Sequence, residues 1–131
     1  MTMKDFINLT PHSLRLRTDA SNMAPEALDS DIVVQPRMNG EGKPNPARVS
    51  ATPGGPNGQA DGVALFGRTA YGTVEGLPAP EADTIYIVSG MVAGRVTDRD
   101  DVYCPGTGPK DNTVRTPEGQ IYAVTRLVMA G

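Results

Sequence analysis

The chain has 131 residues, a length that fits one small domain. Its 12 basic and 15 acidic residues leave a net charge of −3, and no segment carries the basic stripe that binds a nucleic-acid backbone, which argues against DNA or RNA as a partner. The single cysteine excludes an intramolecular disulfide. No apolar run approaches the roughly 18 residues of a membrane span, and residues 1–12 lack a signal-peptide core. These features predict a soluble cytoplasmic protein with no membrane partner.

The first half of the chain is predicted to hold short strands separated by polar turns. Residues 6–9 and 14–17 read as two strands around a Pro-containing turn, and residues 32–34 as a third. Residues 39–61 are dense in Gly, Pro and Asn, which predicts a surface excursion, either ordered or disordered. Within it, residues 48–50 are a candidate for a brief strand.

The second half carries the stronger signals. Residues 63–66 and 71–75 are candidate strands, and residues 84–88 are rich in β-branched and aromatic side chains, which predicts a central strand buried on both faces. Ser89 is a suitable N-cap for one or two helical turns. A hairpin is predicted to close the chain, with residues 120–128 as its second strand after a type I turn. The fold class is therefore α+β: a mainly antiparallel sheet with one short helix in a single domain, residues 1–131.

The segment from Gly106 to Lys110 has the glycines and the lysine of a phosphate loop. A Walker A loop needs G-x-x-x-x-G-K-[ST] between a strand and a helix. Here Pro109 removes one backbone N–H and a hairpin follows, so a polar loop between strands is the favoured interpretation.

Two further groups have polar side chains but lack the spacing of a site. The run from Asp98 to Asp101 lacks calcium-loop spacing, which favours aspartates that pair with neighbouring arginines. His12 and Cys104 are each the only residue of their kind, and a turn role for His12 and a core-filling role for Cys104 are favoured over a catalytic pair. We therefore predict no catalytic residues, no metal site and no cofactor.

Several arginines lie at predicted strand ends or in loops, and the chain also has four tyrosines. Arginine suits bidentate contacts to phosphate and stacking on a nucleobase, and tyrosine rings offer further stacking faces. The alternative is that these arginines lie on solvated strand faces. The sequence by itself favours this alternative.

Six short blocks form a recognisable order: residues 7–12 (INLTPH), 71–78 (YGTVEGLP), 85–89 (IYIVS), 114–115 (VR), 119–121 (GQI) and 123–127 (AVTRL). This order resembles the phage anti-Thoeris (Thoeris anti-defence) proteins, which act as sponges for a nucleotide signal. Residues 39–61 have no counterpart in the resemblance.

The resemblance implies a non-enzymatic protein that forms a homo-oligomer in the cytoplasm of an infected bacterial cell. It would bind a cyclic ADP-ribose-type immune signal, with a cyclic dinucleotide as a further ligand in some members, and so block host anti-phage defence. The residues whose chemistry fits such a ligand are Arg99 and Arg115 for phosphate, Thr107 and Asn112 for ribose or base, and Tyr103 for stacking.

Two other classes of protein remain open on the sequence. A small Gly/Pro-rich β domain with an extension also suits a virion component, such as a capsid-decorating protein. A weaker alternative is a metal-dependent hydrolase of a nucleotide signal that works through Asp100 or Asp101.

Overall fold

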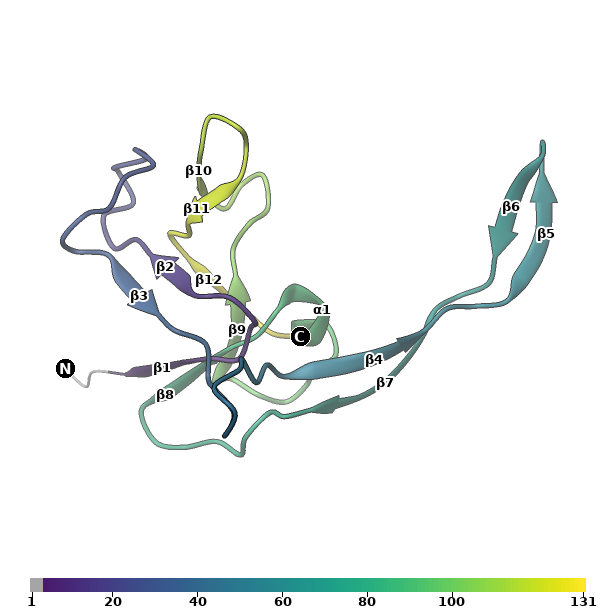
Figure 1. Ribbon diagram of the computed structural model, residues 1–131, viewed down its shortest axis with the longest axis horizontal. Coiled ribbons are helices and arrows are strands. Elements are labelled where there is room, and N and C mark those ends of the chain that lie inside the picture. The colour runs from purple at the N-terminus through teal and green to yellow at the C-terminus, as the bar shows by residue number, and fades with distance from the viewer. Residues whose placement is uncertain (1–3) are drawn as a thin grey trace.

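The computed structural model describes residues 4–131 and has an α+β fold in which short strands predominate (Figure 1). The strands are β1 (Asp5–Asn8), β2 (Leu14–Leu16), β3 (Ile32–Val34), β4 (Arg48–Thr52), β5 (Pro56–Ala60), β6 (Val63–Phe66), β7 (Ala70–Glu75), β8 (Thr84–Ile87), β9 (Val102–Pro105), β10 (Val114–Arg115), β11 (Ile121–Ala123) and β12 (Leu127–Met129), and the helix is α1 (Gly90–Ala93). The predicted fold class is confirmed.

A four-stranded sheet with the order β1-β8-β9-β12 forms the centre of the molecule. Strand β8 lies inside this sheet, and Tyr86 and Ile87 are almost completely buried, as their β-branched and aromatic neighbours predicted. Strand β8 pairs in parallel with both β1 and β9, whereas β12 pairs antiparallel with β9. The sheet is therefore mixed, although the remaining small sheets are antiparallel.

Helix α1 provides the crossover between the parallel strands β8 and β9. Ser89 caps it, accepting a hydrogen bond from the Val92 N–H at 3.5 Å, and Val92 and Ala93 face the core. The helix ends after one turn because the Arg95 N–H donates to the Val92 carbonyl instead of continuing the α-helical pattern. Val96, in the segment between α1 and β9, is also buried.

The predicted C-terminal hairpin is present, but its second strand is broken. A turn closes between β10 and β11, where the Gly119 N–H donates to the Thr116 carbonyl and Gly119 has a φ of 86°. After β11 the chain leaves the hairpin because Val124 exchanges backbone hydrogen bonds with Arg15 and Arg17. Strand β12 therefore joins the central sheet, which the alternation of residues 120–128 did not indicate.

Arg17 is a charged residue whose side chain is completely buried. Its five N–H groups all have acceptors: two contacts at 3.1 Å to the Asp31 carboxylate, and the backbone carbonyls of Asn22, Ala24 and Glu26 at 2.6–2.8 Å. A single guanidinium therefore fixes the loop between β2 and β3, because burial would be costly for any donor without a partner.

A long two-part hairpin, residues 48–75, projects from the body, and we call it the arm (Figure 1). Its inner part is the β4–β7 pair and its outer part the β5–β6 pair. The two parts meet at a neck, where the Gly67 N–H donates to the Gly55 carbonyl at 2.9 Å. A Cβ atom at Gly54 would overlap the backbone of Gly67, so the neck requires glycine. The exposed excursion predicted for residues 39–61 thus contains β4 and β5, and the arm extends beyond it to Glu75.

Candidate functional site

A cavity lies where the arm meets the body. It has a volume of about 560 Å³ and is bounded on one side by β7 and on the other by the segment that follows α1. Its lining residues are Tyr71, Gly72, Thr73, Val74, Leu77, Arg95, Val96, Thr97 and Arg99. A volume of this size is typical of small-molecule sites. We call it the arm-base cavity.

Arg95 is the most distinctive group in the arm-base cavity. Its guanidinium lies over the ring of Tyr71, 3.8 Å from the ring centroid. This is a close cation–π stack. Arg95 forms no salt bridge and no side-chain hydrogen bond within residues 4–131. The cavity therefore contains a positive charge that is oriented by an aromatic ring and whose N–H groups remain available to an anion.

Arg99 lines the same cavity but is already paired. Its Nε and Nη2 donate to the two carboxylate oxygens of Asp101 at 2.8 and 3.0 Å, and Nη2 also donates to the Pro78 carbonyl at 3.0 Å. The hydrogen bonds and charge of Arg99 lower the pKa of Asp101 below its ordinary value. Arg99 thus shapes the cavity wall, and only its Nη1 lacks an acceptor in the described part of the chain.

The hydroxyl groups of Thr73 and Thr97 complete the polar lining, while Val74, Leu77 and Val96 supply apolar surface. Guanidinium groups bind phosphate, aromatic rings stack on bases and hydroxyls bind sugar oxygens. This combination suits a compact ligand that carries phosphate together with a ring system.

The loop between β9 and β10, which has the composition of a phosphate loop, is occupied by its own side chains. The Asp111 carboxylate accepts a hydrogen bond from the Gly108 N–H at 2.8 Å, and the Asp111 N–H donates back to the Gly108 carbonyl at 3.0 Å. The single hydroxyl of Thr125 is shared between the carbonyls of Asp111 and Asn112, at 3.1 and 2.9 Å. An aspartate therefore takes the position in which an anion would be bound, which supports the interpretation of this segment as a polar loop.

Three of the five predicted ligand residues belong to this loop or to the strand after it. Nη2 of Arg115 donates to the Thr107 carbonyl at 3.1 Å and its Nη1 to the Gly119 carbonyl at 3.0 Å, so Arg115 bridges the loop and the C-terminal hairpin. Asn112 adopts a left-handed φ of 54°, and its side chain donates to the Ala20 carbonyl at 3.1 Å. Thr107 also lines a separate, mainly apolar cavity of about 390 Å³ beside His12.

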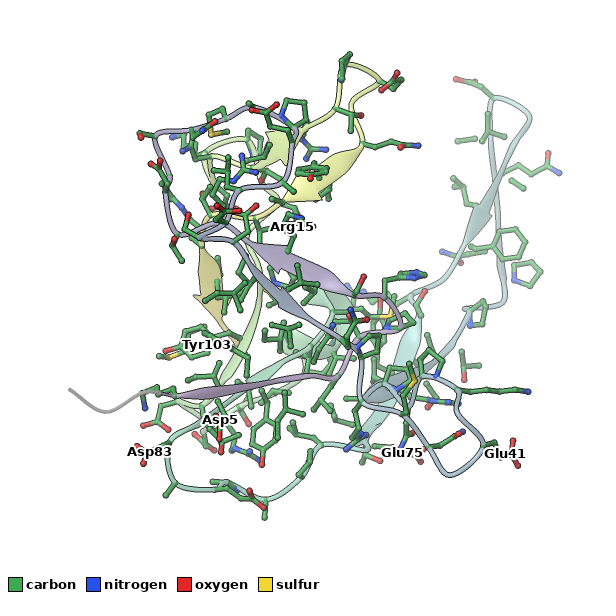
Figure 2. The ribbon with its side chains drawn as sticks, turned by 60° about the vertical axis from the view of Figure 1, so that its left-hand side comes forward. Asp5, Arg15, Glu41, Glu75, Asp83 and Tyr103 are labelled. Atoms are coloured by element: carbon green, nitrogen blue, oxygen red, sulfur yellow. The ribbon has the colours of Figure 1, made fainter. Side chains whose placement is uncertain are left out.

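Tyr103 lies apart from both groups. It is half-buried on β9, opposite Ile87 of β8 and Met129 of β12. Figure 2 shows it on the body of the molecule, near β1 and away from Glu75 at the base of the arm. The structure thus brings Thr107 and Arg115 together, and it places Arg99 and Tyr103 elsewhere.

The sequence interpretation missed the pairing of Arg95 with Tyr71. Tyr71 was only one of four possible stacking faces and Arg95 only a partner for nearby aspartates, because 24 positions separate the two residues. Their contact depends on how β7 packs beside the segment after α1. No local pattern in the sequence marks Arg95, whose neighbours are Gly94 and Val96.

The remaining candidates show ordinary structural environments. Burial raises the pKa of the Cys104 thiol, which disfavours the thiolate, and no hydrogen bond joins Cys104 to the exposed His12. Within residues 4–131, no three His, Cys, Asp or Glu side chains gather in a geometry that could hold a metal ion. The Asp101 carboxylate forms a salt bridge with Arg99, in line with the predicted pairing of these aspartates with neighbouring arginines.

Comparison of the chain with protein-family models, with curated protein sequences and with solved structures found no match. In the part of the chain that the structure describes, no helix has the length and apolar character needed to cross a bilayer.

Proposed function

We propose that this protein is a non-enzymatic sponge that binds and sequesters a cyclic ADP-ribose-type immune signal and so blocks host anti-phage defence. The proposal joins the resemblance to phage anti-Thoeris proteins with one structural observation. That observation is the free guanidinium of Arg95, stacked on Tyr71 in a cavity of about 560 Å³. A phosphate-bearing ligand fits both the charge and the aromatic face.

Sequestration requires slow release, and slow release requires a site that is ordered before the ligand arrives. The stack on Tyr71 holds Arg95, and the bidentate ion pair with Asp101 holds Arg99. Two of the cavity's polar groups are therefore fixed in advance. A second copy in the proposed homo-oligomer would supply a further wall.

The test of this function is a capture experiment. Incubation of the protein with a cyclic ADP-ribose-type signal is expected to remove the signal from the filtrate, and heating the complex is expected to return it chemically intact. Mass spectrometry of the released material distinguishes the outcomes. A cleaved product would show that the protein is an enzyme.

Arg115 provides a separate test of the predicted ligand residues. Arg115 lies outside the arm-base cavity, and two backbone carbonyls occupy only part of its five donors. A ligand bound at the β9–β10 loop would therefore make Arg115→Ala weaken capture about tenfold by removing a phosphate contact, whereas a ligand in the arm-base cavity would leave capture unchanged. Calorimetric titration measures the affinity, and circular dichroism checks that this exposed residue can be replaced without unfolding. If Arg115→Ala binds the signal with unchanged affinity, Arg115 does not contact it, and the arm-base cavity remains the candidate site.

The arm favours one other candidate function, that of a capsid-decorating or other virion protein. Extended hairpins are suited to reach across neighbouring subunits of an assembly, and this arm projects well clear of its own body (Figure 1). Mass spectrometry of purified virions separates the two functions. A decorating protein is found at fixed stoichiometry in the particle, whereas a sponge remains in the infected cell.

A further inference from the structure

We propose that Asn57, on the outer part of the arm, is a site of spontaneous deamidation, in which its side-chain amide becomes a carboxylate through a cyclic imide formed with Gly58. The reaction needs only water as a co-reactant. It does not depend on the identity of any ligand, so the proposal is independent of the proposed function.

The reaction joins two neighbouring groups of the chain. The backbone nitrogen of Gly58 loses its proton to solvent base and attacks Cγ of Asn57. The new N–C bond forms as the Cγ–Nδ2 bond breaks, and Nδ2 takes up a proton and leaves as ammonia. Water then opens the cyclic imide at either of its two carbonyl carbons, which gives aspartate or isoaspartate. A glycine after the asparagine favours ring closure because no Cβ atom crowds the attacking nitrogen.

The sequence contains two such Asn-Gly pairs, at residues 39–40 and 57–58. Every other asparagine is followed by a residue with a side chain, and Asn45 by a proline, which has no N–H to lose. The sequence alone therefore does not distinguish the two pairs, and the fold has to decide which of them reacts.

The pair at residues 39–40 is restrained by hydrogen bonds. Oδ1 of Asn39 accepts from the backbone N–H groups of Glu41 at 2.8 Å and Lys43 at 3.1 Å. The Asn39 N–H also donates to the Lys43 carbonyl at 2.8 Å. Rotation of the Asn39 side chain toward the Gly40 nitrogen would break both bonds to Oδ1. The fold therefore protects Asn39, even though this residue is exposed to solvent.

The pair at residues 57–58 has no such restraint. Asn57 and Gly58 are both exposed, and the Asn57 side chain forms no hydrogen bond within residues 4–131. The register of the β5–β6 pair shifts between Pro56 and Gln59, so the two residues lie in a bulge, where the ladder is disrupted. Apart from its chain neighbours, nothing lies within 4 Å of the position that a Cβ atom of Gly58 would take. The bulge thus leaves room for the ring to close.

The outer hairpin also opens easily. Strands β5 and β6 pair only with each other, and they project clear of the body (Figure 1). An isolated two-stranded hairpin is marginally stable in water, and segments with few buried contacts open without unfolding of the whole protein. Asn57 can therefore reach the geometry of ring closure in the folded protein at little cost.

Deamidation would change the hairpin in two ways. It adds a negative charge to residues 56–66, whose only charged side chain is Asp61. The isoaspartate product also routes the backbone through Cβ, which lengthens β5 by one atom and disturbs its pairing with β6. The reaction therefore weakens the outer hairpin as the protein ages.

The experiment follows both pairs in one incubation of the full-length protein in mildly alkaline buffer. Trypsin cleaves after Arg37, Arg48 and Arg68, whereas Pro44 blocks cleavage after Lys43, so the two pairs fall in separate peptides, 38–48 and 49–68. Mass spectrometry at increasing times measures the fraction of each peptide in which an amide has become an acid. We expect conversion of peptide 49–68 to be about tenfold faster, because peptide 38–48 carries the two hydrogen bonds to Oδ1 in the folded protein.

Incubation of the same protein in urea is the matched control. Unfolding removes the hydrogen bonds of Asn39, so the two peptides should then be converted at similar rates. Asn57→Gln moves the amide one methylene further from the backbone and should abolish the early conversion of peptide 49–68, with an unchanged circular dichroism spectrum. Equal rates for the two peptides in the folded protein, or unaltered conversion of peptide 49–68 in Asn57→Gln, would overturn the proposal.

Discussion

Arg95→Ala is expected to weaken capture of the cyclic ADP-ribose-type signal by about 100-fold, the largest loss that we predict for one side chain on binding. The guanidinium of Arg95 is the one cavity group that is charged, oriented and without a partner among residues 4–131. A charge-assisted hydrogen bond to phosphate contributes about 1.5–3 kcal/mol, which corresponds to a loss of about 10- to 100-fold in affinity. Calorimetric titration provides the measurement.

Two variants sharpen this result. Arg48→Ala removes the same charge from the arm at an exposed position outside the arm-base cavity, and its affinity should be unchanged. Arg95→Lys keeps the charge but loses the planar stack on Tyr71, so an intermediate affinity is expected. Equal affinity for the unmodified chain and Arg95→Ala would exclude the arm-base cavity as the binding site.

Arg17→Leu is expected to have the largest effect on stability, lowering Tm by on the order of 10 °C. The substitution leaves the buried Asp31 carboxylate and three backbone carbonyls without their donor. Arg15→Leu is the matched control: Arg15 also contacts Asp31, at 3.3 Å, but its side chain is 26% exposed. Thermal unfolding followed by circular dichroism should show a much smaller shift for Arg15→Leu, and equal shifts would contradict the role assigned to Arg17.

The same ion pair predicts how stability depends on pH. Hydrogen bonding to Arg17 lowers the pKa of Asp31 to about 2, so the folded state favours the ionised carboxylate. This contribution to stability is fully present above the ordinary carboxyl pKa of about 4 and is lost as the pH falls toward 2. The Tm difference between the unmodified chain and Arg17→Leu should therefore narrow from pH 5 to pH 2. A constant difference over that range would show that Asp31 titrates normally.

Local patterns were sufficient to predict several elements of the fold. Residues 84–88 were identified as the central strand because their side chains suit burial on both faces, and Ser89 as an N-cap because its hydroxyl can accept from the first turn. The parallel pairing of β1 with β8 was not predicted, because the two strands are far apart in the sequence. The break before β12 was also missed, since it depends on contacts that Val124 makes with β2.

The candidate site was harder to predict than the fold. Chemistry alone selected Arg99 as a candidate phosphate contact, but could not show that Asp101 and the Pro78 carbonyl would occupy most of its donors. Arg95 and Tyr71 meet only through the packing of the arm against the body. Residue type thus indicates which side chains have the chemistry of a phosphate or base contact, whereas long-range packing determines which of them keep free donors.

Native mass spectrometry of the protein after mixing with an extract that contains the nucleotide signal tests the central claim most directly. We predict an oligomer that carries the unaltered mass of a cyclic ADP-ribose-type molecule, and the loss of that mass in Arg95→Ala. A protein that emerges without bound nucleotide, or with the mass of a cleaved product, would contradict sequestration.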